Sequence, residues 1–434
     1  MKKRIVGTLM ALLLAVTVLP QGAISVTSAD VTTGLVTTAY AADEHYGGNN
    51  HPICGKECSH SVKHGSVTWE PYVAGQMENG TADNPKYYYL TGDIESDWRF
   101  GNEYVVICLN GHNITSKSGQ TIQVMSGRNV TITDCMPAEQ QGSITHVDNE
   151  TGRGVYVQGV FNMYGGRISG NTYTGFNGGG VSVAGTFNMY GGTISGNTAN
   201  AGGGVYVAQN AKFNMTGGII SENTAGSVGG GVYVGEGTTF NMTGGTISGN
   251  KVEATGSFDG NGGGVYVQDG TFNMDGGLIS GNAASESNYA DGGGVFVIGN
   301  FTMSDGTISG NKAYRGAGVQ VGDYYPNGSL GSGTFTMTGG TIGGTTADAA
   351  NIATYGGGVN VWSTGTFDLR SGSIIGNEAN GTVDENGGGV HSNGTFNVSG
   401  DPIVKSNTRE IQGSIYADNV DSSDKAINVV GALR

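Results

Sequence analysis

The sequence predicts an all-β fold, a right-handed parallel β-helix solenoid with three short strands per coil and roughly twelve coils. Three observations predict it: a unit opened by a run of glycines recurs along the chain, apolar and polar residues alternate inside each unit, and no apolar pattern has helical spacing. The glycine runs begin, for example, at Gly178, Gly202, Gly229, Gly262 and Gly292. The lengths between runs vary in polar, glycine-rich stretches, which are expected to be loops.

One unit spans residues 202–223 and contains the segments Gly-Gly-Gly-Val-Tyr-Val, Phe-Asn-Met and Gly-Gly-Ile-Ile-Ser-Glu-Asn. Alternation places Val205, Phe213 and Ile220 on the inside of a coil. About five inward side chains at ~2 kcal/mol each cannot offset ~1 kcal/mol or more of backbone entropy for each of ~27 residues. A single coil is therefore unstable, and stability must come from stacking like residues of successive coils.

The chain is predicted to have three parts. Residues 1–41 resemble a secretory signal peptide, because three basic residues precede the apolar stretch 5–19, and cleavage is expected after Ala29 or Ala41. Residues 42–85 form an N-terminal segment with Cys and His, and residues 86–434 form the repeat domain. This organisation predicts a secreted, extracellular protein, either free or associated with the cell surface.

The chain is acidic, with a formal net charge of −15. Nucleic acid is therefore not an expected partner, since nucleic-acid binding relies on clustered Lys and Arg. No second long apolar stretch follows the first, so no membrane insertion is expected beyond the signal peptide.

The motif Gly-Gly-Thr-Ile-Ser-Gly-Asn occurs at 191–197 and again at 244–250. Over roughly residues 87–433 the repeat resembles that of extracellular parallel β-helix proteins of Gram-positive bacteria, within the pectate-lyase-like superfamily, and the polymorphic outer-membrane adhesins have similar repeats. The resemblance implies the architecture. It implies no single activity, because that fold includes lyases, hydrolases, adhesins and phage proteins.

Two columns of equivalent residues are candidates for a role. An asparagine column is expected to be structural, with amides bonding from coil to coil; it comprises Asn171, Asn197, Asn223, Asn250, Asn282, Asn311 and Asn377. An outward aromatic column lies between the inward valines and is expected to form a flat exposed stripe; it comprises Tyr156, Tyr206, Tyr233, Tyr266 and Phe296, interrupted by Ser182. Its rings either stack on one another or offer a platform for sugar faces or a protein partner.

The sequence shows no column of acidic residues of the kind that glycan lyases and hydrolases use. Asp259, Asp269, Asp275 and Asp291 occur close together in the chain, but no Lys or Arg is expected to stand with them. No catalytic residue is therefore predicted, and an enzyme is the less favoured reading.

The segment before the coils has four candidate zinc ligands, Cys54, Cys58, His60 and His64. A disulfide between Cys54 and Cys58 is the competing interpretation in an exported protein. Cys108 and Cys135 lie 27 residues apart, which is close to one coil, and are expected to stack at equivalent positions as buried thiols, although a crosslink between them stays open.

These features favour a noncatalytic binding or adhesive protein, glycan-directed through the outward aromatic column. A polysaccharide lyase or glycoside hydrolase is the alternative, and a purely structural spacer is a third hypothesis. The sequence does not identify the ligand, the attachment to the envelope or the oligomeric state.

Overall fold

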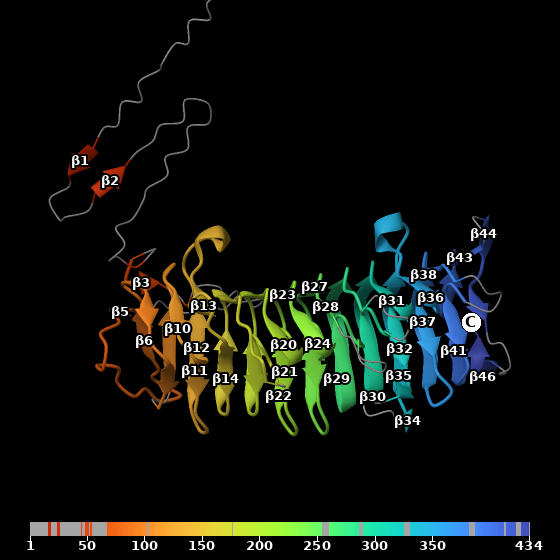
Figure 1. The fold of residues 1–434 in the computed structure, drawn as a ribbon, viewed down its shortest axis with the longest axis horizontal. Helices are drawn as coiled ribbons and strands as arrows, with labels where there is room; N and C mark the ends of the chain where they lie inside the picture. The colour runs from red at the N-terminus through yellow and green to blue at the C-terminus, as the bar shows by residue number, and fades with distance from the viewer. Residues whose placement is uncertain are drawn as a thin grey trace, which may run out of the picture.

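A computed structural model describes residues 16–18, 24–26, 45, 48–51, 53, 67–101, 104–175, 177–253, 260–285, 290–324, 330–381, 387–411, 414–421 and 427–433. These residues form a parallel β-solenoid, in which strands of successive coils lie side by side along a rod (Figure 1). The solenoid is the predicted fold class, and Val205, Phe213 and Ile220 all point into a lumen where each is fully buried.

The first face is the stack of strands that follow the glycine runs, and twelve successive strands of the described chain belong to it. They are β8 (Trp98–Phe100), β11 (Gly119–Val124), β14 (Gly152–Val157), β17 (Val181–Val183), β21 (Val205–Val207), β25 (Val232–Val234), the starts of β29 (Val265–Ser280) and β30 (Val295–Ser309), β32 (Val319–Val321), β37 (Val359–Val361), β40 (Val390–Ser392) and β45 (Val420–Asp421).

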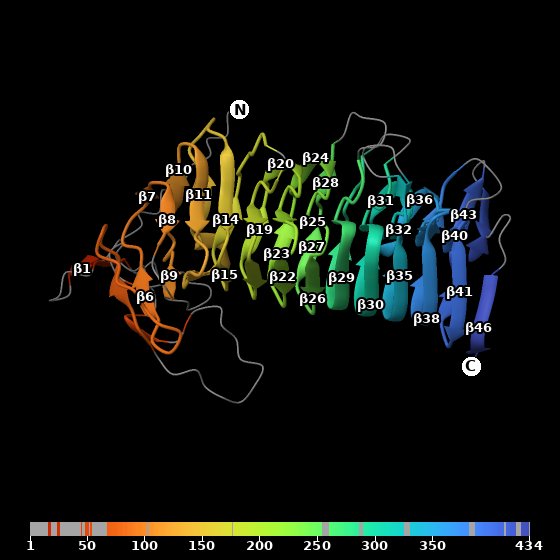
Figure 2. The ribbon, with the colours of Figure 1, turned by 90° about the horizontal axis from the view of Figure 1, so that it is seen from below.

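The second face contains the Phe-Asn-Met segments and runs the length of the rod in both views (Figures 1 and 2). Its strands are β5 (Glu70–Pro71), β6 (Lys86–Tyr89), β9 (Val105–Cys108), β12 (Asn129–Thr133), β15 (Val160–Met163), β18 (Thr186–Met189), β22 (Lys212–Met215), β26 (Thr239–Met242), the middles of β29 and β30, β35 (Thr334–Gly343), β38 (Thr366–Ile375), β41 (Thr395–Gly400) and β46 (Ile427–Leu433).

The third face ends at the asparagine column. Its strands are β7 (Ile94–Glu95), β10 (Ile114–Ser116), β13 (Ser143–His146), β16 (Arg167–Ser169), β19 (Thr193–Ser195), β23 (Ile219–Ser221), β27 (Thr246–Ser248), the ends of β29, β30, β35 and β38, and β42 (Ile403–Lys405).

A fourth set of short strands, which the three-strand repeat did not predict, joins the third face to the first. One sheet contains β20 (Thr198–Ala201), β24 (Thr224–Val228) and β28 (Lys251–Val252). The other contains β31 (Lys312–Arg315), β36 (Ile352–Tyr355), β39 (Glu378–Ala379), β43 (Thr408–Ile411) and the antiparallel β44 (Ser414–Ala417).

The remaining described elements are short. Antiparallel pairs join β1 (Val16–Val18) to β2 (Ile24–Val26), β3 (Asn50–His51) to β4 (Val67–Thr68), and β33 (Asp323–Tyr324) to β34 (Leu330–Gly331). Two 3-10 turns lie at Ala138–Gln140 and Ala347–Ala349. The predicted signal segment 1–41 lies almost wholly outside the described residues.

The lumen is filled by columns of identical side chains. One column contains a phenylalanine ring from each of nine successive coils, from Phe161 to Phe396, and neighbouring rings are stacked with centroids 4.6–5.3 Å apart. The rings are parallel because in-register strands place the same rotamer one coil above itself. The period-two alternation of the sequence therefore separates an apolar lumen from the exterior, as predicted.

The glycine runs allow the coils to approach closely at the start of the first face. Gly202 has a φ of +63°, a conformation that favours glycine. A Cβ on the next residue, Gly203, would lie 2.4 Å from the carbonyl oxygen of Thr224 in the following coil. The run is thus required both for the turn and for the backbone contact between coils.

The asparagine column is a continuous buried hydrogen-bond ladder. Asn223 accepts both the backbone N–H and the amide N–H of Asn197, at 3.0 and 2.9 Å, and donates to the carbonyl oxygen of Ile194, at 3.0 Å. The same pattern recurs in the neighbouring coils, and Asn351 and Asn407 extend the predicted column. These side chains are fully buried, so the predicted structural role is confirmed.

Candidate functional site

The outward aromatic column lies on the first face, and the strand register places its members at equivalent positions. Tyr206 pairs with Ser182 on one side and with Tyr233 on the other, and the column continues through Tyr266 to Phe296. The rings lie outside the lumen, as alternation predicts, because the flanking valines point inward. Consecutive rings from Tyr206 onward stack with centroids 4.5–5.7 Å apart.

The expectation that this column forms an exposed stripe is wrong for its C-terminal part. Tyr233 is 9% exposed, and Tyr266 and Phe296 are fully buried. They form a second apolar cluster with Ala201 and Val228, which belong to the short fourth strands. Because these strands were not predicted, alternation alone could not show that the rings would be covered.

The exposed end of the aromatic column lies toward the N-terminus. Tyr156 and Tyr206 are both half-buried, and Ser182, which is buried, lies between them. Two coils separate the rings, which is about 9.6 Å along the rod. The guanidinium of Arg153 lies 5.2 Å from the ring centre of Tyr156 and 4.2 Å from that of Tyr173. This stretch of the first face, the Tyr156–Tyr206 surface, thus has a buried serine between two half-buried rings and a cation beside one of them.

Beyond Phe296 the same column becomes polar. His391 Nδ1 lies 2.7 Å from the amide oxygen of Asn360, whose amide nitrogen donates to Gln320 at 2.7 Å. Gln320 in turn donates to the carbonyl oxygen of Gly322 at 2.8 Å. Burial lowers the pKa of His391, so the neutral imidazole is favoured, with its proton on Nδ1.

A buried ion cluster stands beside this polar stretch. Arg315 donates from Nε to both carboxylate oxygens of Asp291, at 3.0 Å each, and from Nη2 to Asp291 at 2.5 Å and to Asp323 at 2.8 Å. Its guanidinium lies 4.4 Å from the ring centre of Trp362. The expectation that no basic residue stands with the acidic residues is therefore wrong for Asp291, because one coil of 24 residues separates Asp291 from Arg315 and brings them together.

The electrostatics of the cluster favour one protonated carboxyl. The side chains of Asp291 and Asp323 are 1% and 5% exposed, and that of Arg315 is 14% exposed. Burial raises the pKa of Asp291 well above its usual range, Arg315 opposes the shift, and the neighbouring Asp323 adds to it. Two carboxyls sharing one guanidinium resemble an acid–base pair, but in this arrangement both are held by Arg315 away from solvent.

The predicted zinc ligands Cys54, Cys58, His60 and His64 lie outside the described residues. Of the other two cysteines, Cys108 is fully buried with a free thiol, as predicted, but the expectation of a thiol at Cys135 is wrong, because Cys135 is disulfide-bonded. The expectation that Cys108 stacks on Cys135 is wrong, because the register pairs Cys108 with Thr133. Cys135 follows that strand, and its sulfur turns back to within 3.0 Å of the Cys108 sulfur.

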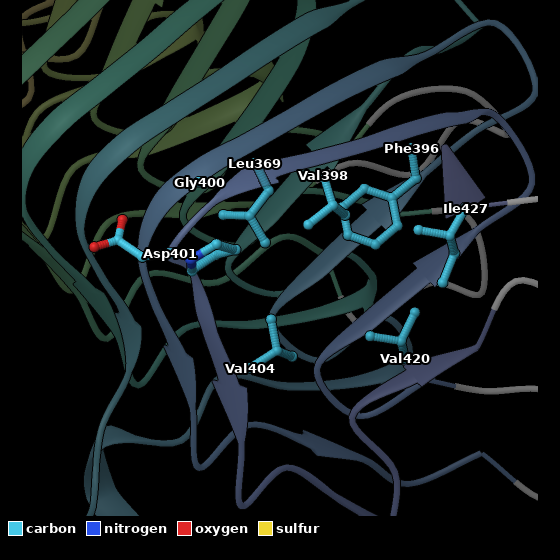
Figure 3. Close-up of a pocket in the computed structure, with 9 residues that line it drawn as sticks. Leu369, Phe396, Val398, Gly400, Asp401, Val404, Val420 and Ile427 are labelled. Atoms are coloured by element: carbon cyan, nitrogen blue, oxygen red, sulfur yellow. The ribbon is translucent and has the colours of Figure 1, made fainter. Parts of the chain in front are cut away.

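An apolar pocket lies at the C-terminal end of the lumen (Figure 3). Its side chains include Leu369, Phe396, Val398, Val404 and Ile427, and the carboxylate of Asp401 points away from them. The pocket continues the apolar columns of the lumen, and its one lining carboxylate, Asp401, points away from the apolar side chains, so we do not take it as a candidate active site.

Within the described residues, no helix is both long and apolar enough to cross a membrane. No protein-family model matches the chain, and searches of curated proteins and of solved structures likewise find no match. The fold that is established is thus a parallel β-solenoid, and its family is not assigned by similarity.

Proposed function

We propose that this protein is a noncatalytic binding or adhesive protein of the cell exterior, and that the Tyr156–Tyr206 surface binds a glycan. One observation carries the proposal: two half-buried aromatic rings face outward at equivalent positions two coils apart, with the smaller Ser182 between them. Sugar rings have apolar faces that pack against aromatic rings, and hydroxyls that bond to groups such as the Arg153 guanidinium.

The Tyr156–Tyr206 surface favours an extended ligand over a small one. Its residues lie on successive parallel strands of one sheet, in line along the axis of the rod. A polymer lying along the rod would contact both rings at once, which increases affinity without requiring a deep cavity. This geometry suits a surface glycan and a protein that acts by attachment.

A test can use serine as the substitution, because the column already has serine at position 182. The variant Tyr156→Ser with Tyr206→Ser is expected to keep its fold and to lose about tenfold or more in affinity for glycans that the wild type binds on an array. Tyr190→Ser is the matched control, since Tyr190 is 40% exposed and follows the second face. A wild type that binds no glycan, or a double variant that binds equally well, would contradict the proposal.

A polysaccharide hydrolase is the second candidate, and the Asp291, Asp323 and Arg315 cluster favours it. The cluster supplies two carboxyls, one with a raised pKa, as acid–base hydrolysis of a glycosidic bond requires, but a substrate would first have to displace Arg315, which bridges them and keeps them from solvent. A panel of acidic and neutral polysaccharides would test this function: turnover by the wild type that is lost in Asp323→Asn would establish it, and absence of turnover would count against it.

A further inference from the structure

Three potential metal ligands from distant parts of the chain meet at the N-terminal end of the rod. His45 precedes β3, Cys108 ends β9, and Cys135 follows β12 in the next coil. The Cys135 sulfur lies 3.0 Å from the Cys108 sulfur and 3.3 Å from His45 Nε2, and the three ligand atoms all lie within 4.8 Å of one another. His45 is 1% exposed, Cys108 0% and Cys135 9%.

The surroundings hold these groups in place. The His45 imidazole is stacked on the Tyr89 ring with centroids 4.7 Å apart, and it meets the Trp69 ring edge-on at 4.9 Å. The Cys108 sulfur accepts the backbone N–H of Cys135 at 3.3 Å. Burial raises the pKa of the Cys108 thiol and this backbone donor only opposes the shift, so a bound cation is needed to favour the thiolate.

The spacing fits a small tetrahedral cation. Zinc bound at about 2.3 Å to sulfur and 2.0–2.1 Å to nitrogen would separate two sulfurs by roughly 3.7 Å and a sulfur from a nitrogen by roughly 3.5 Å. The observed 3.0 and 3.3 Å differ from these values by less than 1 Å, so small side-chain rotations would admit the ion. Two sulfurs and one imidazole favour zinc over calcium or magnesium, which prefer oxygen ligands.

In the structure Cys135 is disulfide-bonded, whereas the neighbouring Cys108 thiol is free. His45 Nε2 lies 3.3 Å from the Cys135 sulfur, so both groups could bind one cation once the disulfide is reduced. The two states are alternatives, because zinc binds a thiolate.

We propose that His45, Cys108 and Cys135 bind zinc when Cys135 is reduced. A phosphine or dithiol reductant supplies two electrons, and with two protons the disulfide becomes two thiols. Zinc binding then displaces the protons of Cys108 and Cys135, and water fills the fourth position. The ion would fasten the segment around His45 to the first coils, a role separate from glycan binding.

The experiment uses the full chain, reduced with a phosphine, freed of metal and titrated anaerobically with Co²⁺ and then Zn²⁺. We expect one equivalent of Co²⁺ to give a thiolate-to-cobalt charge-transfer band that Zn²⁺ removes. His45→Ala and Cys108→Ser should each weaken binding about tenfold or more. His112→Ala is the matched control and should bind as the wild type does.

Absence of the band in the wild type would overturn the proposal. So would a band that persists at full strength in Cys108→Ser with Cys135→Ser, because the metal would then be held elsewhere. X-ray absorption of zinc-loaded wild type avoids dependence on the folding of variants. At least two sulfur ligands and one imidazole are expected there, whereas a shell of oxygen ligands or of four sulfurs would contradict the assignment.

Discussion

The amide oxygen of Asn223 accepts two hydrogen bonds from Asn197, one from its backbone and one from its side chain. This relationship recurs from coil to coil, so each asparagine stabilises the turn of the coil before it as well as its own. The ladder is buried, and its hydrogen bonds have no competition from water. Register between coils is therefore specified by polar contacts as well as by the apolar lumen.

Breaking this ladder should be costly. Asn223→Ala leaves both donors of Asn197 and the carbonyl oxygen of Ile194 buried without their partner. At about 1–3 kcal/mol for each unsatisfied group, we expect the free energy of unfolding to fall by about 3 kcal/mol or more, as measured by denaturant unfolding. Asn214→Ala is the control, because Asn214 belongs to a half-buried ladder, and it should cost about 1 kcal/mol or less. Equal losses in the two variants would contradict this account.

A methyl group in the glycine run should also be destabilising. A Cβ at Gly203 would lie 2.4 Å from the Thr224 carbonyl oxygen and 2.7 Å from that of Gly230, so Gly203→Ala forces coils apart. We expect a loss of about 1–3 kcal/mol or more in thermal or denaturant unfolding. Gly92→Ala, where no atom lies within 4 Å of the added Cβ, should change stability by less than about 0.5 kcal/mol. A tolerated Gly203→Ala would argue against the close approach of the coils.

The ion cluster predicts that removing its cation destabilises the fold more than neutralising one of its carboxyls. Arg315→Met leaves two buried carboxyls without a cation, and should lower the free energy of unfolding by about 3–5 kcal/mol near neutral pH. Asp291→Asn keeps the shape and leaves one carboxylate paired with Arg315, so it should cost much less. Equal losses in the free energy of unfolding for the two variants would show that the stability of the cluster does not depend on its charge balance.

The same cluster predicts a pH dependence. Because burial raises the pKa of Asp291 above its unfolded value, proton binding favours the folded state. The corresponding stability is present at low pH and is lost as the pH rises through the raised pKa. Unfolding curves across this range should show the loss in the wild type and not in Asp291→Asn. A free energy of unfolding that rises with pH over this range in the wild type, and not in Asp291→Asn, would contradict a raised pKa for Asp291.

The repeat in the sequence was enough to predict the solenoid, the lumen residues and the asparagine column, because all three depend on local alternation and on equivalence between units. The covering of Tyr266 and Phe296 was not predictable in this way. It depends on Ala201 and Val228, small residues in segments with no strong strand pattern. Their approach to the rings is a tertiary contact that alternation does not encode.

The polar clusters were missed for a related reason. Asp291 and Arg315 lie one coil apart in a stretch where the coil length differs from its neighbours, so their equivalence is visible only once the register is known. His45 has no repeat around it, and nothing in the sequence indicated that it would reach Cys108 and Cys135. Sequence periodicity thus predicts what repeats, whereas the sites depend on residues that do not.

The stacking of equivalent residues one coil apart is tested most directly by measuring distances between pairs of labelled residues along the rod. Unnatural amino acids that carry spin labels can replace the exposed Thr216 and one second residue, Ser304, Thr338 or Arg370. Each of these residues directly follows the Phe-Asn-Met segment or its equivalent, and the second residues lie three, four and five coils after Thr216. Dipolar spectroscopy should give backbone separations of about 14, 19 and 24 Å, an equal step for each coil despite unequal sequence spacing. Separations that follow sequence distance, or that do not rise by a constant step, would contradict the solenoid.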